Sequence, residues 1–264
     1  MTAASAVDET KWRAILDWRP LLLPIGLLVF FELVARVAPP ETDFWPMPSR
    51  IVSAWLEALL DGSLIFATAQ TLQATLGGLG TGIAIGLLLG IILGLLPTID
   101  RLLAISIETI RPIPPTAIIP IALLVWGIGL QMEMAIAAFS ATWPILIFTR
   151  GAIRGVEPRL IEVSRILRLG FVRSVWKIVL PAALPRIFVA IRLAAAVSLI
   201  VCVTVEVTAN PYGLGNAMRE AQQALRPEMM FAYLVWIGIV GWFFNGAIVW
   251  LQKRMVRPPA KVTT

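Results

Sequence analysis

Ionisable side chains inside long apolar runs are the residues of this sequence whose type and position could do chemistry. Arg111, Arg186, Arg192 and Glu206 lie in such runs. An ionisable group at the centre of a membrane costs about 2.5–3.5 kcal/mol on insertion scales, so each one needs a partner or a function. Glu108 precedes Arg111 by three residues and could pair with it on one helix face. The alternative is that Arg111 lends positive charge to a path for anions.

The motifs of common enzyme sites are absent from the sequence. It has no His, and its one Cys, Cys202, lies in an apolar run. An intrachain disulfide is therefore impossible, and a metal site of His or Cys ligands is not expected. No phosphate-binding loop occurs, of the pattern Gly, four residues, Gly-Lys, then Ser or Thr, and neither does a Gly-x-Ser-x-Gly, His-Glu-x-x-His or Cys-x-x-Cys motif. We therefore expect no catalytic residue, no metal and no nucleotide site in this chain.

The composition is typical of a membrane protein that crosses the bilayer several times. Hydrophobic residues make up 58% of the 264 and charged residues only 14%, and the mean hydropathy is +0.85. A soluble domain would carry about 25% charged residues. About 20 residues cross the hydrocarbon core of a bilayer as a helix. We therefore predict an all-α fold with six transmembrane helices at residues 20–38, 65–96, 102–129, 132–149, 181–208 and 229–251.

The segments around the first span are predicted to be helical as well. No small-residue cleavage site follows residues 20–38, so this run is interpreted as an uncleaved helix and not as a signal peptide. Glu32 and Arg36 are four residues apart and are predicted to pair near its end. Short helices outside the spans are predicted at residues 51–60 and 216–225.

Glycines and prolines set the second and third spans apart. In the second span, glycine recurs at every fourth position from Gly78 to Gly94, which gives a smooth face for close approach of another backbone. Packing within the same bundle is the favoured use of this face, and contact with another subunit is the alternative. The third span contains four prolines between Pro112 and Pro120, which no uninterrupted helix accommodates. Either its backbone is broken beside the transport path, or its helix simply starts after Pro115.

The distribution of basic residues predicts the topology. With the N-terminus inside, fifteen Lys and Arg residues fall in cytoplasmic segments and four on the opposite side, and the remaining three, Arg111, Arg186 and Arg192, lie within spans. Cytoplasmic segments carry the excess of Lys and Arg in membrane proteins. Both termini are therefore predicted to be cytoplasmic. This topology explains the net charge of +6, so we expect no nucleic acid as a partner.

The longest polar interval between two apolar spans runs from Arg150 to Arg186. Pro158 is suited to the first turn of a helix. Leu160, Val163 and Leu167 then lie on one stripe at helical spacing, and Gly170 is expected to end the helix. A second short amphipathic helix is expected from Phe171, and Pro181 and Pro185 are expected to open the fifth span.

This interval resembles the cytoplasmic loop of the permease subunits of importers driven by ATP-binding-cassette ATPases. The family pattern is Glu-Ala-Ala, three residues, Gly, nine residues, Ile, one residue, Leu-Pro. The residues in register with it are Glu162, Val163, Ser164, Ile178, Leu180 and Pro181. Arg168 stands at the position of the family's Gly, and the nearest glycine is Gly170. The segments RPIPPTAIIP and IVLPAALPRI resemble the nitrate, sulfonate and taurine branch, and the whole resemblance covers about residues 64–251.

The resemblance implies a domain organisation and a set of partners. It implies a type I importer transmembrane domain at residues 64–251, preceded by a cytoplasmic tail (1–19) and by the first helix with an extracytoplasmic segment (20–63), and followed by a cytoplasmic tail (252–264). It also implies an inner-membrane permease that acts in two copies, with two ATPase subunits and a periplasmic or lipid-anchored binding protein. ATP and Mg²⁺ would be bound by the ATPases, so no cofactor is expected in this chain.

The resemblance also assigns roles to particular residues. The coupling helix that contacts the ATPase would comprise Leu160, Glu162, Val163, Ser164, Leu167, Arg168 and Gly170. The broken third span and the charge of Arg111 indicate Arg111, Pro114 and Pro115 as residues of the pathway or its gate. The resemblance adds Glu206, Gly213 and Gly215, since a Glu shortly before Gly-Leu-Gly occurs in related permeases. The substrate would be a small anion such as nitrate, a sulfonate or taurine. The alternative is a stand-alone secondary transporter or channel.

Overall fold

The computed structural model describes residues 19–37 and 46–255, and these residues are organised into helices without any strand. The predicted tails before residue 19 and after residue 255 lie outside the described residues. In chain order the elements are α2 (Arg19–Val37), α3 (Pro48–Leu60), α4 (Ser63–Leu95), α5 (Pro97–Ile110), the 3-10 turn η1 (Pro115–Ile118), α6 (Ile119–Trp126), α7 (Leu130–Arg154), α8 (Pro158–Ile166), α9 (Phe171–Ser174), the π turn η2 (Val175–Val179), α10 (Leu180–Thr208), α11 (Leu214–Gln223) and α12 (Pro227–Met255).

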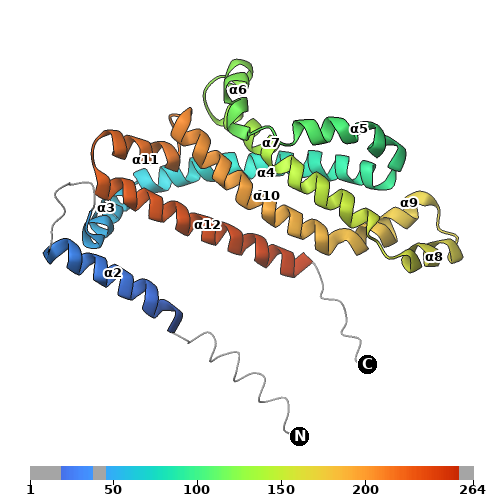
Figure 1. Ribbon diagram of the computed structural model, residues 1–264, viewed down its shortest axis with the longest axis horizontal. Coiled ribbons are helices and arrows are strands. Elements are labelled where there is room, and N and C mark those ends of the chain that lie inside the picture. The colour runs from blue at the N-terminus through green and yellow to red at the C-terminus, as the bar shows by residue number, and fades with distance from the viewer. Residues whose placement is uncertain (1–18, 38–45, 256–264) are drawn as a thin grey trace, which may run out of the picture.

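The long helices lie roughly side by side and form a bundle with two distinct ends (Figure 1). We call them the α8 end and the α11 end, after the short helix found at each. Four single stretches of the described residues are long and apolar enough to span a membrane: α4, α7, α12 and the continuous helix Phe171–Thr208. The bent pair Pro97–Ile110 and Pro115–Trp126 would make a fifth span. The first predicted span corresponds to α2, a helix of 19 residues.

The centre of the bundle is the contact between α4 and α7, and the glycine face makes it possible. A Cβ atom added to Gly82 would lie 2.6 Å from Cβ of Ala141, and one added to Gly90 would lie 2.7 Å from Cβ of Thr149. The two backbones are therefore so close that no side chain fits between them at these positions. The prediction that this face packs within its own bundle is confirmed.

The direction of this packing fixes the path of the segment in between. Gly82 faces Ala141 and Gly90 faces Thr149, so residue numbers rise together along the two helices and α4 and α7 are parallel. The chain leaves α4 at the α8 end and enters α7 at the α11 end. Residues 96–129 therefore run the full length of the bundle, although α5 and the following η1–α6 helix meet at an angle of 86°. The predicted break in the third span is confirmed, with helix on both sides of it; its place beside the transport path stays a prediction.

Two predicted boundaries of this region and of the fifth span are wrong. The third span was predicted from residue 102, but α5 begins five residues earlier at Pro97, a first-turn position that tolerates proline. The fifth span does not begin at Pro181 but is continuous from Phe171 to Thr208. Its π turn, Val175–Val179, ends two residues before Pro181. A π turn widens the helix where proline removes a hydrogen bond, so Pro181 is accommodated within the continuous helix. Pro185 lies inside α10 as well.

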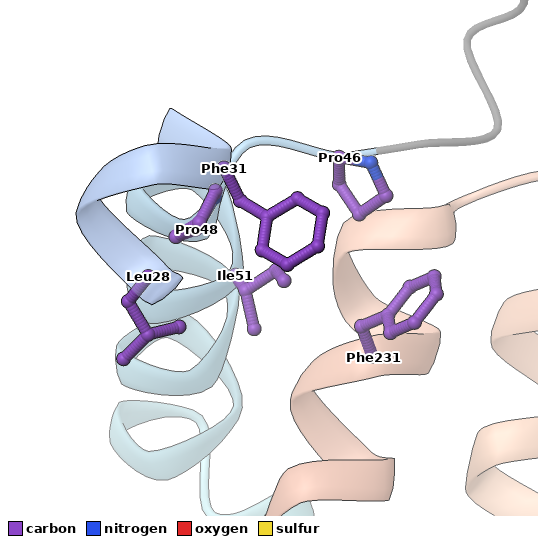
Figure 2. Close-up of a pocket in the computed structure, with 6 residues that line it drawn as sticks. All are labelled: Leu28, Phe31, Pro46, Pro48, Ile51 and Phe231. Carbon is purple, nitrogen blue, oxygen red and sulfur yellow. The ribbon is translucent and has the colours of Figure 1, made fainter. Parts of the chain in front are cut away.

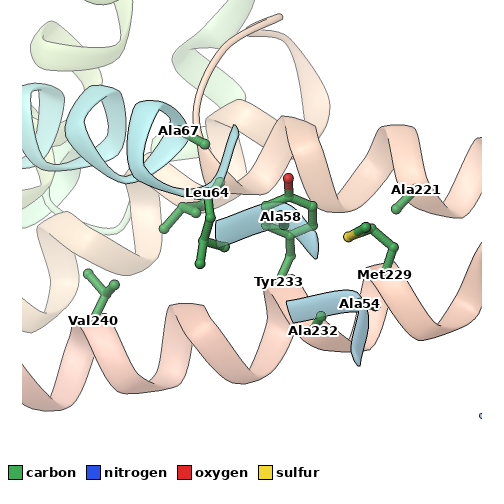
Figure 3. Close-up of a cluster of buried hydrophobic side chains, with 10 residues drawn as sticks. Ala54, Ala58, Leu64, Ala67, Ala221, Met229, Ala232, Tyr233 and Val240 are labelled. Carbon is green, nitrogen blue, oxygen red and sulfur yellow. The ribbon is translucent and has the colours of Figure 1, made fainter. Parts of the chain in front are cut away.

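At the α11 end, α3 and α11 cover the ends of α4 and α12. Figure 3 shows the apolar cluster there, to which α4 contributes Leu64 and Ala67, α3 contributes Ala58 and α12 contributes Tyr233. The hydroxyl groups of Ser63 and Tyr233 are 3.1 Å apart, which ties α12 to the start of α4. The short helices predicted at residues 51–60 and 216–225 are both confirmed, within a few residues at each boundary.

Helix α2 is attached to the bundle through α3. The Glu32 carboxylate accepts hydrogen bonds from the backbone N–H and the hydroxyl of Ser49, at 3.0 and 2.9 Å, in the first turn of α3. The predicted pair is confirmed, since Arg36 donates to Glu32 at 2.8 Å. Figure 2 shows Phe31 of α2 and Ile51 of α3 lining a small apolar hollow with Phe231 of α12.

Candidate functional site

The predicted coupling helix is present at the α8 end as α8, and its apolar residues are not covered by the rest of the chain. Leu160 is 38% exposed, Val163 45% and Leu167, just after the helix, 61%. Glu162 also lies on the exposed surface. Ser164 is the exception, since it is buried and its hydroxyl donates to the Ile161 carbonyl at 2.6 Å. The helix therefore presents an apolar row to its surroundings while Ser164 packs inward.

The end of α8 shows how the chain turns without the family's glycine. Arg168 adopts a left-handed backbone conformation, with φ 51°. The Leu169 N–H donates to the Ser164 carbonyl at 3.0 Å, and the Leu167 N–H donates to the Val163 carbonyl at 3.0 Å. The bond from Leu169 to Ser164 around a left-handed residue is typical of the Schellman motif, which usually has glycine at this position.

The prediction that Gly170 ends this helix is therefore wrong. Helix α8 ends at Ile166, two residues before the left-handed Arg168. Gly170 has an extended conformation, with φ −62° and ψ 157°, and lies just before the first turn of α9. Arg168, at the position of the family's Gly, thus takes the left-handed conformation that favours glycine, and Gly170 precedes the next helix instead.

A buried carboxylate holds the base of the α8 segment in place. Asp100 of α5 has an 8% exposed side chain and accepts from Arg150 at 2.8 Å and from Arg154 at 2.7 Å. Arg154 also donates to the Leu93 carbonyl at the end of α4, at 3.0 Å. These contacts connect three helices immediately before the chain enters α8. Sequence analysis missed Asp100 because it lies between two predicted spans; the two arginines near the end of α7 were the available signal.

At the α11 end, Glu206 holds the turn between α10 and α11. Its carboxylate accepts from the Thr71 hydroxyl at 2.6 Å and from the Gly215 N–H at 2.8 Å. Thr71 in turn accepts from the Leu214 N–H at 2.9 Å. Gly213 has a φ of 90°, which favours glycine, and its N–H donates to Gln70 at 3.0 Å. The predicted residues Glu206, Gly213 and Gly215 are thus brought together.

A second buried carboxyl group beside this turn was not predicted. Glu133, in the first turn of α7, is only 2% exposed. Its Oε2 atom accepts from the Asn210 side-chain amide at 2.6 Å. An acidic residue inside the predicted fourth span was the signal that could have identified it. No group of His, Cys, Asp or Glu side chains suited to a metal ion occurs within residues 19–37 and 46–255.

The proline-rich segment is divided between the surface and the bundle. Arg111, Pro114 and Pro115 lie where α5 gives way to η1. Arg111 is exposed, and the part of the chain that the structure describes shows no ion pair between it and Glu108, so the predicted pair is wrong. The following residues, Ile119 and Ala122, pack on the α7–α10 pair beside Val205, next to Glu206.

Comparison with known proteins places this architecture in a family. The chain is 27% identical over 265 residues to SsuC of Bacillus subtilis (strain 168), a permease protein assigned to aliphatic sulfonate transport, covering 97% of this chain and 93% of SsuC. It is 28% identical over 260 residues to the bicarbonate transport system permease protein CmpB of Synechococcus elongatus, covering 94% of this chain and 93% of CmpB.

The fold is also that of a solved transporter. A chain of the MetNI methionine ABC transporter in an inward-facing conformation superposes with a TM-score of 0.64 at 22% identity, covering 71% of this chain and 94% of that one. The family model described as binding-protein-dependent transport system inner membrane component matches residues 82–257, which include α7, α8 and the Glu206 turn. This chain therefore belongs to the family of inner-membrane permease components of binding-protein-dependent transport systems.

Proposed function

We propose that this permease subunit forms the membrane path of an ATP-driven importer and that α8 is the docking element for a separate ATPase subunit. The exposed apolar row of Leu160, Val163 and Leu167 carries the proposal. A short helix outside the apolar spans has no lipid to cover such a row. A groove on a partner protein is a favourable environment for the apolar face of a helix. The ATPase would bind ATP and Mg²⁺, and this chain would bind neither.

The orientation follows from the charges at the two ends. Arg101, Arg150, Arg154, Arg159 and Lys177 all belong to segments at the α8 end. Because basic residues concentrate on the cytoplasmic side, the α8 end would face the cytosol, together with both termini. The α11 end would then face the binding protein that delivers the substrate. Coupling would consist of α8 transmitting movement of the ATPase to α7 and to the continuous helix Phe171–Thr208, which flank it in the chain.

The solute proposed for this path is a small anion such as nitrate, a sulfonate, taurine or bicarbonate. SsuC and CmpB, which this chain resembles along its length, are named for sulfonates and bicarbonate. Exposed Arg111, at the break between α5 and η1, would place a positive charge beside the path formed with a second copy of the chain. Pro114, Pro115, Glu206, Gly213 and Gly215 would border the same path. A stand-alone transporter or channel is disfavoured by the family membership.

The test of the proposal is recovery of the ATPase with purified permease. Leu167→Asp or Val163→Asp would place a charge in the contact, and an unpaired buried charge costs several kcal/mol. We expect the variant to insert at normal levels, to retain little ATPase and to lose transport.

Arg159→Ser provides the matched control on the same helix. The Arg159 side chain is 86% exposed and lies 3.9 Å from Glu157, so its loss should leave ATPase recovery unchanged. Equal recovery of the ATPase with wild-type and Leu167→Asp protein, together with unchanged transport, would show that α8 is not the coupling element.

A further inference from the structure

An exposed arginine lies well inside the membrane-spanning part of the bundle, where α10 runs beside α12 (Figure 1). The Nε atom of Arg192 in α10 donates to Oδ1 of Asn245 in α12 at 2.9 Å. Asn245 lies eight residues before Lys253, the first basic residue at the end of α12, which is about 12 Å along the helix. Arg192 lies 16 residues before Thr208, where α10 ends, which is about 24 Å. The contact is therefore far from both ends of these helices.

The Arg192 guanidinium has no counter-charge near it. The acidic residues of α10 and α12 are Glu206 and Glu228, which lie 14 residues from Arg192 and 17 residues from Asn245, more than about 20 Å along either helix. Within residues 19–37 and 46–255, Arg192 takes part in no ion pair. Charged residues inside membrane spans almost always face the protein interior or a water-filled cavity. We therefore expect Arg192 to face an aqueous space and not lipid.

The bond to Asn245 orients the guanidinium and leaves its outer side available. A guanidinium has five N–H donors, one on Nε and two on each of Nη1 and Nη2. Nε is occupied by Asn245, and the two Nη atoms meet no acceptor in the part of the chain that the structure describes. Two such nitrogens match two oxygens of one oxyanion. The neighbours of Arg192 one turn away on α10 are Val189 and Ala196, which offer no competing acceptor side chain.

We propose that Arg192, positioned by Asn245, binds the oxyanion of the solute that passes through the permease. The inference rests on the proposed function, because it takes the ligand to be the small anion carried by the path. A lipid phosphate offers the same chemistry, but lipid phosphates lie outside the hydrocarbon layer. Because its Nε is held at Asn245, the guanidinium cannot extend the distance of about 12 Å to the basic end of α12. The solute is therefore the proposed source of the anion.

The first test measures whether a water-soluble dicarbonyl reagent, which modifies accessible guanidinium groups, reaches Arg192 in full-length permease in phosphatidylcholine bilayers. Mass spectrometry resolves the modification of each arginine. We expect Arg192 to be modified, and to be protected by at least one of ethanesulfonate, bicarbonate and nitrate but not by chloride, which has no pair of oxygens. Arg159, 86% exposed on α8, is the control and should be modified equally with and without these anions.

Three results of this labelling would overturn the proposal. An unmodified Arg192 would show that it faces lipid. Modification that none of the three oxyanions reduces would show that no such ligand binds there. Protection by phosphatidylglycerol in the bilayer, without any added oxyanion, would assign the site to a lipid headgroup.

The second test keeps Arg192 as the reporter and changes the residue that positions it. Asn245→Asp places a negative charge against the guanidinium, so half-protection should require at least about tenfold more anion. Asn245→Ala should also raise this concentration, because Nε is no longer held. Gly246→Ala is the matched control on α12, since its added Cβ would meet nothing within 4 Å, and should behave as the wild type. Wild-type protection in Asn245→Asp would contradict the assignment.

The third test measures transport of the protecting anion by the permease assembled with its ATPase and binding protein. Arg192→Gln should recover as much ATPase as the wild type but lose most transport, and Arg192→Lys, which keeps the charge without the paired Nη atoms, should be intermediate. Unchanged transport by Arg192→Gln would refute the role of Arg192. Failure of the proposed function itself would appear differently, as no ATPase recovered with the wild-type permease, whereas labelling of Arg192 needs no ATPase.

Discussion

The close contact of α4 and α7 makes a sharp prediction about two glycines in one helix. Gly82 faces α7, where an added Cβ would lie 2.6 Å from Ala141 Cβ and 3.0 Å from the Ala138 carbonyl oxygen. Gly80 is exposed on the same helix, and an added Cβ there would meet nothing within 4 Å. Gly82→Ala and Gly80→Ala therefore make the same chemical change in two different environments.

The expected magnitudes follow from two opposing effects. Replacing glycine by alanine in a helix interior stabilises it by roughly 0.5–1 kcal/mol at either position. At Gly82 the added methyl must also push apart two backbones, and overpacking of this kind costs typically about 1–3 kcal/mol. We expect Gly80→Ala to be neutral or slightly stabilising. Gly82→Ala should be less stable than Gly80→Ala by about 1–3 kcal/mol, which is the overpacking cost alone.

The assay is reversible unfolding of the purified permease by titration with a denaturing detergent, with helix content as the signal. Gly90→Ala serves as a second position on the same face, since its added Cβ would lie 2.7 Å from Thr149 Cβ. If Gly82→Ala and Gly90→Ala unfold at the same detergent concentration as Gly80→Ala, then α4 and α7 do not approach as closely as described, and the account of this interface is refuted.

Three further predictions concern the α8 end and the pathway. Arg168→Gly should relieve the left-handed strain by about 1 kcal/mol and slow hydrogen exchange of the Leu169 N–H that closes the turn; faster exchange would contradict this assignment. Asp100→Asn should lower the free energy of unfolding by about 1.5–3 kcal/mol through loss of its charge-assisted bonds to Arg150 and Arg154, whereas Glu157→Gln, in an exposed pair at 3.9 Å, should change it little. Single cysteines at residues 111–120 and 206–215, in a Cys202→Ala background, should change their labelling by a water-soluble thiol reagent when nucleotide is trapped on the ATPase. Uniform inaccessibility in every state would count against a pathway there.

Much of the fold could be predicted because lipid leaves few choices for the backbone. Apolar runs of sufficient length must become helices, and glycine repeating every fourth position from Gly78 to Gly94 must lie on one face. Pro112 to Pro120 could be identified as a break for the same reason. What these patterns could not specify is the neighbour of each face, so the parallel arrangement of α4 and α7 is visible only in three dimensions.

The wrong boundaries share a physical cause, which is that proline and glycine permit several conformations. Pro181 was expected to start a helix, but a preceding π turn allows it inside a continuous one. Gly170 was expected to end α8, but Arg168 takes the left-handed conformation two residues earlier. Local preference favours glycine at that turn without requiring it, so the structure of the surrounding segment decides.

The candidate site was predicted only where it has a local sequence signal. The row of Leu160, Val163 and Leu167 and the sequence from Glu206 to Gly215 are contiguous enough to be recognised. Asp100 and Glu133 were missed because their partners lie far away in the sequence, 50 residues away for Arg150 and 77 for Asn210. Buried polar groups find partners through tertiary packing, which no single stretch of sequence encodes.

The glycine face has a consequence for movement during transport. The glycines of this face leave depressions that recur every four residues, which is about 6 Å along a helix with a rise of 1.5 Å per residue. Between the depressions lie larger side chains such as Leu79 and Ile83, so α7 cannot slide along α4 by a small amount without collision. The next position at which the two surfaces match is four residues away, and a shift to it would break the contacts at both ends of the bundle. We therefore expect α4 and α7 to travel as one rigid unit, leaving displacement to the helices packed around them.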